Sequence, residues 1–216
     1  RTLVACGTAA AIAGSFNTPI AGVIFAMEVV VMEYTIASFI PVIIAAVTST
    51  ILTHYFVGNE PAFTVTPLQM QSLLEIHGAM MGQIALFSLV VIVLLKTVTS
   101  AAAVGLGVPV GLIGPTFVIG AAVGGVLGYF GSYFQPAEAT SVGFYVMLGM
   151  SAMMAAVLQA PLAALMAVTE LTANPNIVLP TMVAIVIATL VTSVVFKQKS
   201  VFLSTMDTLG LQYPPD

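Results

Sequence analysis

Residues 105–115 read Gly-Leu-Gly-Val-Pro-Val-Gly-Leu-Ile-Gly-Pro, and this segment decides what kind of fold the chain adopts. It interrupts a run from Thr97 to Ala137 that contains no Asp, Glu, Lys or Arg. Four glycines and two prolines in eleven residues do not support a continuous helix. Hydrocarbon offers no water to the backbone groups that such a break exposes. We therefore expect protein or a polar cavity to enclose this segment.

The residues after the break, Thr116 to Tyr133, predict a helix that Pro115 would open. The break would leave backbone N–H groups and the positive end of the helix dipole inside an apolar region, which is an arrangement that binds anions. Since the chain has only four Lys and Arg residues, it would have to attract anions with dipoles instead of a ring of cations. A kink or a helix crossing lined by glycine is the other interpretation of the same residues.

The composition is that of an integral membrane protein. Hydrophobic residues make up 60% of the 216, charged residues make up 6%, and the mean hydropathy is +1.15. The charge-free runs are near or beyond the roughly 20 residues that a spanning helix needs; they cover residues 2–27, 34–59, 97–137, 139–169 and 171–196, with a shorter run at 79–95. We expect an all-α membrane protein with about six to eight helical pieces, some of them re-entrant.

Several classes of protein do not fit these residues. A net charge of −4 excludes nucleic acid as a partner. The single Cys6 supports neither a disulfide framework nor a metal site. No catalytic Ser/His, paired Asp or His-x-x-x-His pattern occurs in the apolar runs, so we expect neither an enzyme nor a cofactor. Arg1 leads directly into a small-residue helix, so we expect the chain to begin inside a larger protein.

Residues 7–28 align without gaps on residues 149–170, which indicates an internal repeat. In both copies a small-residue helix meets a polar residue, then a proline two positions on, then an apolar helix that ends in a glutamate nine residues after the proline. Internal repeats of broken helices enclose midplane sites in many transporters. The identical pairs are Gly7/Gly149, Ala10/Ala152, Ala13/Ala155, Pro19/Pro161, Ala21/Ala163 and Glu28/Glu170.

Three segments together resemble the CLC family of chloride channels and chloride/proton antiporters. Residues 14–28, Gly-Ser-Phe-Asn-Thr-Pro-Ile-Ala-Gly-Val-Ile-Phe-Ala-Met-Glu, resemble that family's Gly-x-Phe-x-x-Pro-Leu-Ala-Gly-x-x-Phe-x-x-Glu helix pair. Residues 111–115 look like its third anion-binding segment, and residues 159–172 resemble the matching helix pair of the second half. The resemblance implies a CLC-like bundle of inverted repeats with broken and re-entrant helices.

The resemblance implies that only part of such a protein is present. The two upstream anion-binding segments of the family, and with them its gating glutamate, have no counterpart here. We expect residues 1–57 to end the first repeat, residues 58–78 to form a loop or a deletion junction, residues 79–206 to form the second repeat, and residues 207–216 to begin a cytoplasmic tail. His54 and His77 flank the junction, where we expect interfacial exposure.

The resemblance also implies the binding residues. It places the backbone amides of Leu112 and Ile113 on the anion, with Gly111 and Gly114 allowing close approach and Pro115 opening the helix. Chloride would be the bound substrate.

Phe202 takes the position where the family usually presents a Tyr hydroxyl to the central anion. Here that hydrogen bond would be absent, although the ring could still shape the pore. An aromatic residue at the membrane interface is the alternative.

The proton route is also altered. Val29 stands where antiporters of the family carry an inner proton-relay glutamate, which favours a channel-like mechanism or weak proton coupling by another route. Glu33 could substitute only if the helix continues that far. Glu28 and Glu170 are ionisable groups in apolar segments and hence functional candidates. Their matching positions favour a shared structural role, such as accepting hydrogen bonds from backbone N–H groups.

By the same resemblance the protein would be a homodimer whose partners are chloride or another small anion and the lipid bilayer. The helices assigned to the dimer interface cover residues 19–31, 34–56, 161–172 and 177–195, whose apolar side chains would suit lipid contact equally well. Lys197 and Lys199 place the end of the last run in the cytoplasm, and we expect a bacterial inner membrane. Two alternatives remain: a secondary transporter of another small anion, and a structural fragment without transport of its own.

Overall fold

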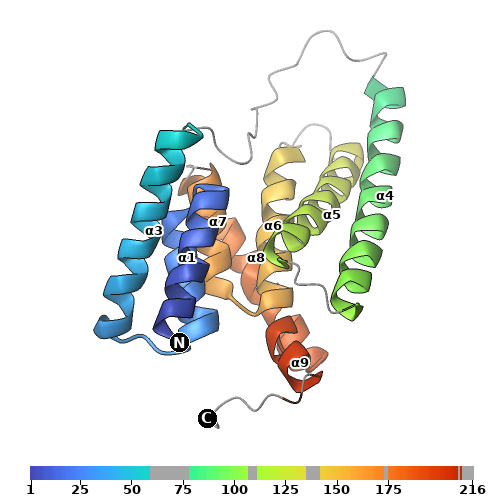
Figure 1. Ribbon diagram of the computed structural model, residues 1–216. Helices are drawn as coiled ribbons and strands as arrows, with labels where there is room; N and C mark the ends of the chain where they lie inside the picture. Colours follow the sequence, from blue (N-terminus) through green and yellow to red (C-terminus); the bar gives the residue numbers. More distant parts are fainter. Residues whose placement is uncertain (59–77, 107–110, 135–141, 173–174, 209, 211–216) are drawn as a thin grey trace. The chain divides into compact units, whose positions relative to one another are not determined.

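The computed structural model describes residues 1–58, 78–106, 111–134, 142–172, 175–208 and 210 (Figure 1). They form two compact units, residues 1–64 with 155–216 and residues 65–154. The α-helices are α1 (Thr2–Phe16), α2 (Pro19–Phe25), α3 (Ile36–Phe56), α4 (Gly78–Gly105), α5 (Ile113–Phe134), α6 (Val142–Leu158), α7 (Pro161–Thr172), α8 (Val178–Leu190) and α9 (Val201–Thr208). Shorter helical segments are η1 (Ala26–Val31), η2 (Pro175–Ile177) and η3 (Val191–Val195).

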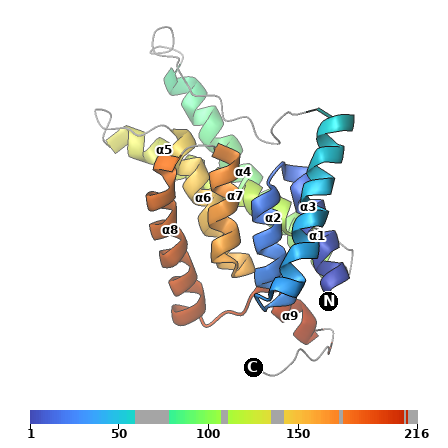
Figure 2. The same ribbon diagram turned by 90° about the vertical axis from the view of Figure 1, so that its left-hand side faces the viewer.

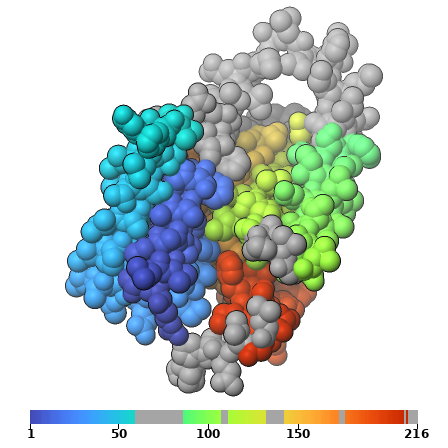
Figure 3. Space-filling model, in the orientation of Figure 1, coloured from blue at the N-terminus to red at the C-terminus, as the bar shows by residue number. Residues whose placement is uncertain are grey.

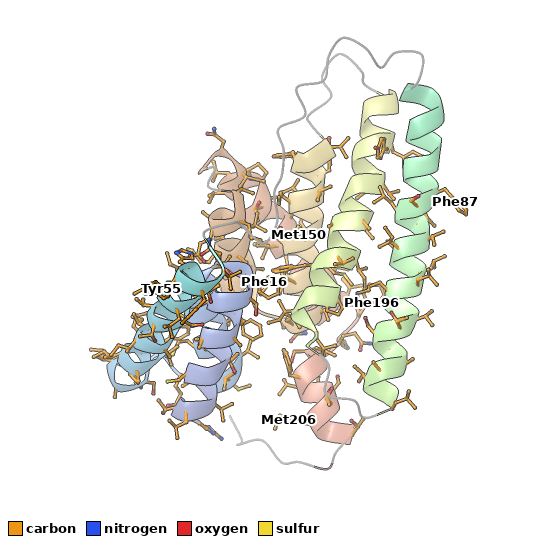
Figure 4. All side chains as sticks on the ribbon, turned by 45° about the horizontal axis from the view of Figure 1, so that its top comes forward. Phe16, Tyr55, Phe87, Met150, Phe196 and Met206 are labelled. Atoms are coloured by element: carbon orange, nitrogen blue, oxygen red, sulfur yellow. The ribbon has the colours of Figure 1, made fainter. Side chains whose placement is uncertain are left out.

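Four of the described helices are long and apolar enough to cross a membrane: Ile36–Phe56, Leu86–Gly105, Ile113–Gly131 and Val178–Val195. Large apolar side chains stand exposed along them, because lipid or further protein replaces water as their surroundings. Phe87 of α4 is 71% exposed and points away from the helices of its unit, and Tyr55 of α3 is 81% exposed (Figure 4). The all-α membrane fold expected from composition is confirmed.

In the first unit, α1 and α3 pack side by side (Figure 3). Their contact is made largely by alanines that are fully buried, so the two backbones approach closely, as small residues allow in membranes. A hydroxyl joins the same two helices, because Ser49 Oγ donates a hydrogen bond to the carbonyl oxygen of Ala10 at 2.7 Å. The buried cluster comprises Ala5, Ala9, Ala13, Val23, Ala26, Met27, Val31, Val42 and Ala46.

Helix α2 lies against α1 at Gly22. A Cβ at Gly22 would come within 2.8 Å of the carbonyl oxygen of Ala9, which is backbone and cannot turn aside. The absence of a side chain at Gly22 therefore lets α2 approach α1 closely and sets the depth at which α2 lies in this unit.

In the second unit, α5 crosses α6 at glycines. A Cβ at Gly120 would collide with the carbonyl group of Gly149, and a Cβ at Gly124 with the carbonyl group of Tyr145. Helix α4 packs on the same α5 through Leu89, which faces Gly125. These close contacts along α5 fix the position of the whole helix in this unit, and with it the position of its amino end.

The internal repeat is visible in the backbone of the first unit. Asn17 follows the end of α1 and Gln159 follows the end of α6, and both residues adopt the left-handed conformation, with φ of 55° and 52°. Pro19 and Pro161 then open α2 and α7, which lie side by side (Figure 2). Proline suits this position because the first N–H groups of a helix have no intrahelical acceptor.

Some expected boundaries need correction. Helix α5 begins at Ile113, before Pro115, because Pro115 fits within the first helical turn. The described residues hold nine α-helices, more than expected. Helix α9 follows the last apolar run, carries Asp207 and contains Phe202, where the family resemblance implies a short helix. The junction at 58–78 lies outside the described residues except at its two end glycines, and His77 also lies outside them.

Candidate functional site

The amino end of α5 presents backbone N–H groups that the helix does not use. The first backbone bond of the turn runs from the N–H of Thr116 to the carbonyl oxygen of Leu112 at 3.1 Å. The N–H groups of Ile113 and Gly114 precede this bond, and Pro115 has no N–H to offer. Because the first turn contains no acidic residue, the positive end of the helix dipole is not neutralised there.

The side chains at this end leave room around the backbone. Gly111 is exposed, and the four residues after it are half-buried. A Cβ placed on Gly111 or Gly114 would meet no described atom within 4 Å. The hydroxyl of Thr116 turns back to the carbonyl oxygen of Ile113, at 2.7 Å. The surroundings of residues 111–115 therefore leave room for an anion beside the amides, and binding of an anion there stays a prediction.

Phe202 belongs to the other unit, near the start of α9. Ser200 precedes this helix, and its Oγ accepts a hydrogen bond from the N–H of Leu203 at 3.3 Å. Lys199 pairs with Asp207 at 2.7 Å along the helix. Phe202 is half-buried and contacts Phe25 edge to face, with ring centroids 6.1 Å apart at 70°. The orientation of its ring is therefore set partly by α2.

Val29 is half-buried within η1, where the helix widens to a π-type turn. The helix ends two residues later at Val31, and Met32 takes the left-handed conformation with φ of 59°. Glu33 therefore does not continue the helix and is exposed, so the condition for its substituting as a relay is not met. No titratable side chain stands at position 29.

Glu28 and Glu170 each cap the helix that carries, or is continued by the segment that carries, the other glutamate, through four hydrogen bonds to backbone N–H groups. The carboxylate of Glu170 accepts bonds from the N–H groups of Ile20 and Ala21, at 2.9 and 2.7 Å, at the start of α2. The carboxylate of Glu28 does the same for α7, from the N–H groups of Leu162 and Ala163, at 3.3 and 2.9 Å.

This is the shared structural role expected from the matching positions of the two glutamates. What sequence reasoning missed is the exchange of partners: each carboxylate serves the helix of the other half. Glu170, near the carboxyl end of α7, binds the amino end of α2, and Glu28, in the η1 segment that continues α2, binds the amino end of α7, so α2 and α7 run antiparallel. A negative charge at a helix amino end is also favoured by the dipole.

The polar residue at each helix break also has a partner. Asn17 Oδ1 lies 2.7 Å from His54 Nε2, and Gln159 Nε2 donates to the carbonyl oxygen of Gln198 at 2.6 Å. His54 is therefore half-buried and hydrogen-bonded, in place of the exposure expected from its position near the junction. The repeated placement of a polar residue two positions before a proline was the signal that could have predicted these bonds.

No group of three or more His, Cys, Asp or Glu side chains that could hold a metal ion occurs in the part of the chain that the structure describes.

The chain matches the sequence profile of the voltage gated chloride channel family over residues 1–85 and again over residues 68–193. The chain belongs to this family. Like the CLC family, it is an integral membrane protein built of helices, and the resemblance found in its motifs is confirmed. The two matched ranges overlap at residues 68–85, which include the second half of the expected junction.

Two curated members of the CLC family illustrate the similarity. A protein of Ralstonia nicotianae, described by its likeness to the chloride channel protein ClcB, is 27% identical over 248 residues, with 85% of this chain and 58% of that protein covered. The H(+)/Cl(−) exchange transporter ClcA of Yersinia pestis is 25% identical over 261 residues, with 88% and 55% covered. This chain thus spans little more than half the length of either relative. Both alignments are longer than its 216 residues, so the relatives carry inserted positions.

Among solved structures, the crystal structure of a slow cyanobacterial Cl−/H+ antiporter shares the fold of this CLC family chain. The TM-score is 0.69 at 18% sequence identity, and the match covers 98% of this chain and 65% of the antiporter. At this sequence identity, the similarity supports a shared fold and nothing further.

Proposed function

We propose that the protein containing this chain transports chloride, or another small anion, across a membrane, and that residues 111–115 contact the ion. The observation that carries the proposal is the amino end of α5, where the backbone N–H groups of Ile113 and Gly114 lie before the first helical bond. An anion at this point would replace its hydration shell with amide hydrogens. Membership of the CLC family and the names of the two relatives support chloride as the ion.

The charges of the described residues agree with an anion path that uses dipoles. The described part of residues 65–154 contains no carboxylate. A buried carboxylate near the amides of Leu112 and Ile113 would compete with an incoming anion, and the nearby sequence supplies none. Separately, on the family resemblance alone, Phe202 is proposed to present an apolar ring to the anion where the family usually presents a hydroxyl.

Transport is proposed to be channel-like or only weakly coupled to protons. Val29 cannot titrate, Glu33 lies beyond the end of η1, and the carboxylate of Glu28 is occupied by two backbone N–H groups of α7. Moving a proton onto Glu28 would weaken both bonds. These three side chains therefore leave no free inner relay on this helix.

The assembly is proposed to be a homodimer in a bacterial inner membrane, without enzyme activity and without a cofactor. Exposed apolar residues on the outer sides of α2 and α7, such as Ile20 at 55% and Leu162 at 50%, agree with a protein or lipid neighbour there. Because the chain spans little more than half of its relatives, these statements concern the complete polypeptide.

The test is chloride efflux from liposomes that contain the complete polypeptide, with external pH recorded at the same time. Chloride efflux with a flat pH trace supports the uncoupled mechanism. A change in external pH during chloride efflux, with no proton gradient imposed, shows that proton movement is coupled to chloride. It requires a proton relay other than residue 29. If the folded protein moves another small anion but not chloride, the result favours the secondary transporter. If it moves no anion, the remaining interpretation is a structural role without transport.

The role of the α5 amides can be tested directly with a backbone ester at Ile113, which removes one N–H and keeps the side chain. We expect chloride affinity to fall about tenfold, as for loss of one hydrogen bond to a charged group. An ester at Ala122, in the middle of the same helix, is the matched control for helix destabilisation. Equal effects of the two esters would contradict an ion at the amino end of α5.

A further inference from the structure

Phe25 is the residue that this inference concerns, and it rests on the proposed role of Phe202 in the anion path. Phe202 lies on α9, a helix of eight residues in which no side chain is buried. Such a short helix is weakly held, because most helical stability in proteins comes from packing. Among the ring contacts described for this unit, Phe202 meets Phe25, edge to face at 6.1 Å. The position of the Phe202 ring therefore depends on what holds Phe25.

Phe25 is held firmly. It is 2% exposed, at the end of α2. Gly22 seats this helix against the backbone of α1, and Glu170 binds its amino end. Glu28, three residues after Phe25, is bonded in turn to α7. These contacts fix the backbone that carries Phe25, and its side chain is buried, so Phe25 is a firm support for the ring that contacts it.

The internal repeat shows that the scaffold itself does not require an aromatic residue here. At the offset of 142 that relates Pro19 to Pro161, the counterpart of Phe25 is Ala167. Ala167 is also buried, at 3% exposure, and α7 forms around it without a ring. The role of the aromatic side chain is therefore specific to the first copy of the repeat. In that copy the Phe25 ring contacts the Phe202 ring.

We propose that Phe25 is a positioning residue that fixes the orientation of the Phe202 ring and thereby sets which anions the pathway accepts. An aromatic ring attracts an anion at its edge and repels it at its face. The angle at which Phe202 stands therefore decides whether the pathway is favourable to an anion. Without a hydroxyl at this position, ring orientation and aperture replace hydrogen bonding as the means of selection.

The experiment measures the ratio of nitrate flux to chloride flux in liposomes, with the complete polypeptide and its Phe25→Ala variant. Loss of the support frees the Phe202 ring to turn, so we expect the ratio to change at least threefold, while chloride flux persists. Phe25→Leu keeps apolar volume without a ring and should change the ratio less. Val42→Ala is the matched control, because Val42 is fully buried in the same unit on another helix.

A double variant distinguishes positioning from general loosening. In a Phe202→Ala background, Phe25→Ala should have no further effect on the ratio, because the supported ring is gone. Any of three outcomes overturns this inference alone. The flux ratio is unchanged in Phe25→Ala, it changes equally in Val42→Ala, or Phe25→Ala has its full effect on the ratio in the Phe202→Ala background. If the unaltered protein moves neither chloride nor nitrate, the proposed function fails and this inference fails with it.

Discussion

Replacing Glu170 with Gln should destabilise the first unit measurably while leaving side-chain size almost unchanged. The Glu170 carboxylate accepts bonds of 2.9 and 2.7 Å from the N–H groups of Ile20 and Ala21. Gln retains one acceptor oxygen, but its NH₂ group would face a backbone N–H, so one bond is lost and the other loses its charge. Hydrogen bonds to charged groups contribute about 1.5–3 kcal/mol each in soluble proteins, and side-chain bonds measured in a membrane protein contribute at most about 1.7 kcal/mol.

From these values we expect Glu170→Gln to lower the free energy of unfolding by about 2 kcal/mol. Glu28→Gln should cost less, about 1 kcal/mol, because one of its two bonds, to Leu162, is longer, at 3.3 Å. For a chain of this size, 1 kcal/mol corresponds to about 2–4 °C in melting temperature, so the two variants should melt about 4–8 °C and 2–4 °C lower.

The assay is thermal unfolding in detergent, followed by far-ultraviolet circular dichroism. Glu33→Gln is the matched control, because Glu33 is exposed beyond the end of η1, and its melting temperature should stay close to that of the unaltered protein. The double variant of Glu28 and Glu170 should show additive losses, since the two caps share no donor. The reasoning from bond length and charge would be refuted if Glu170→Gln had the same melting temperature as the unaltered protein. It would also be refuted if Glu28→Gln lowered the melting temperature more than Glu170→Gln.

Further substitutions test the other sites. Gly149→Ala should cost about 2–3 kcal/mol in thermal unfolding, because its Cβ would collide with the carbonyl group of Gly120; Gly7→Ala, at the matching repeat position with open space, should stabilise by up to about 1 kcal/mol. Val29→Glu should introduce proton movement during chloride efflux, recorded as a change in external pH; a flat trace would show that position 29 is not on a proton route. Phe202→Tyr adds a hydroxyl donor and should tighten chloride binding about tenfold by calorimetry; unchanged affinity would place residue 202 away from the ion.

The helix breaks and the repeat could be predicted because their signals are local. In both copies of the repeat, a proline two positions after a polar residue predicts a new helix, and Pro19 and Pro161 open helices as expected. The boundary of α5 was predicted less well, since Pro115 can occupy any position in a first turn. The end of η1 at Val31 carries no Gly or Pro, so the sequence did not indicate that Glu33 leaves the helix.

By itself, the sequence determined the membrane class, the all-α fold and the family, because each follows from composition or from residues adjacent in the chain. Only the tertiary structure decided which groups meet. Glu28 and Glu170 were matched in sequence, but their exchange of helices joins residues 134 to 150 positions apart. The contact between Phe25 and Phe202 is of the same kind. Such partners depend on how antiparallel helices are placed in space, and no local pattern of residues contains that placement.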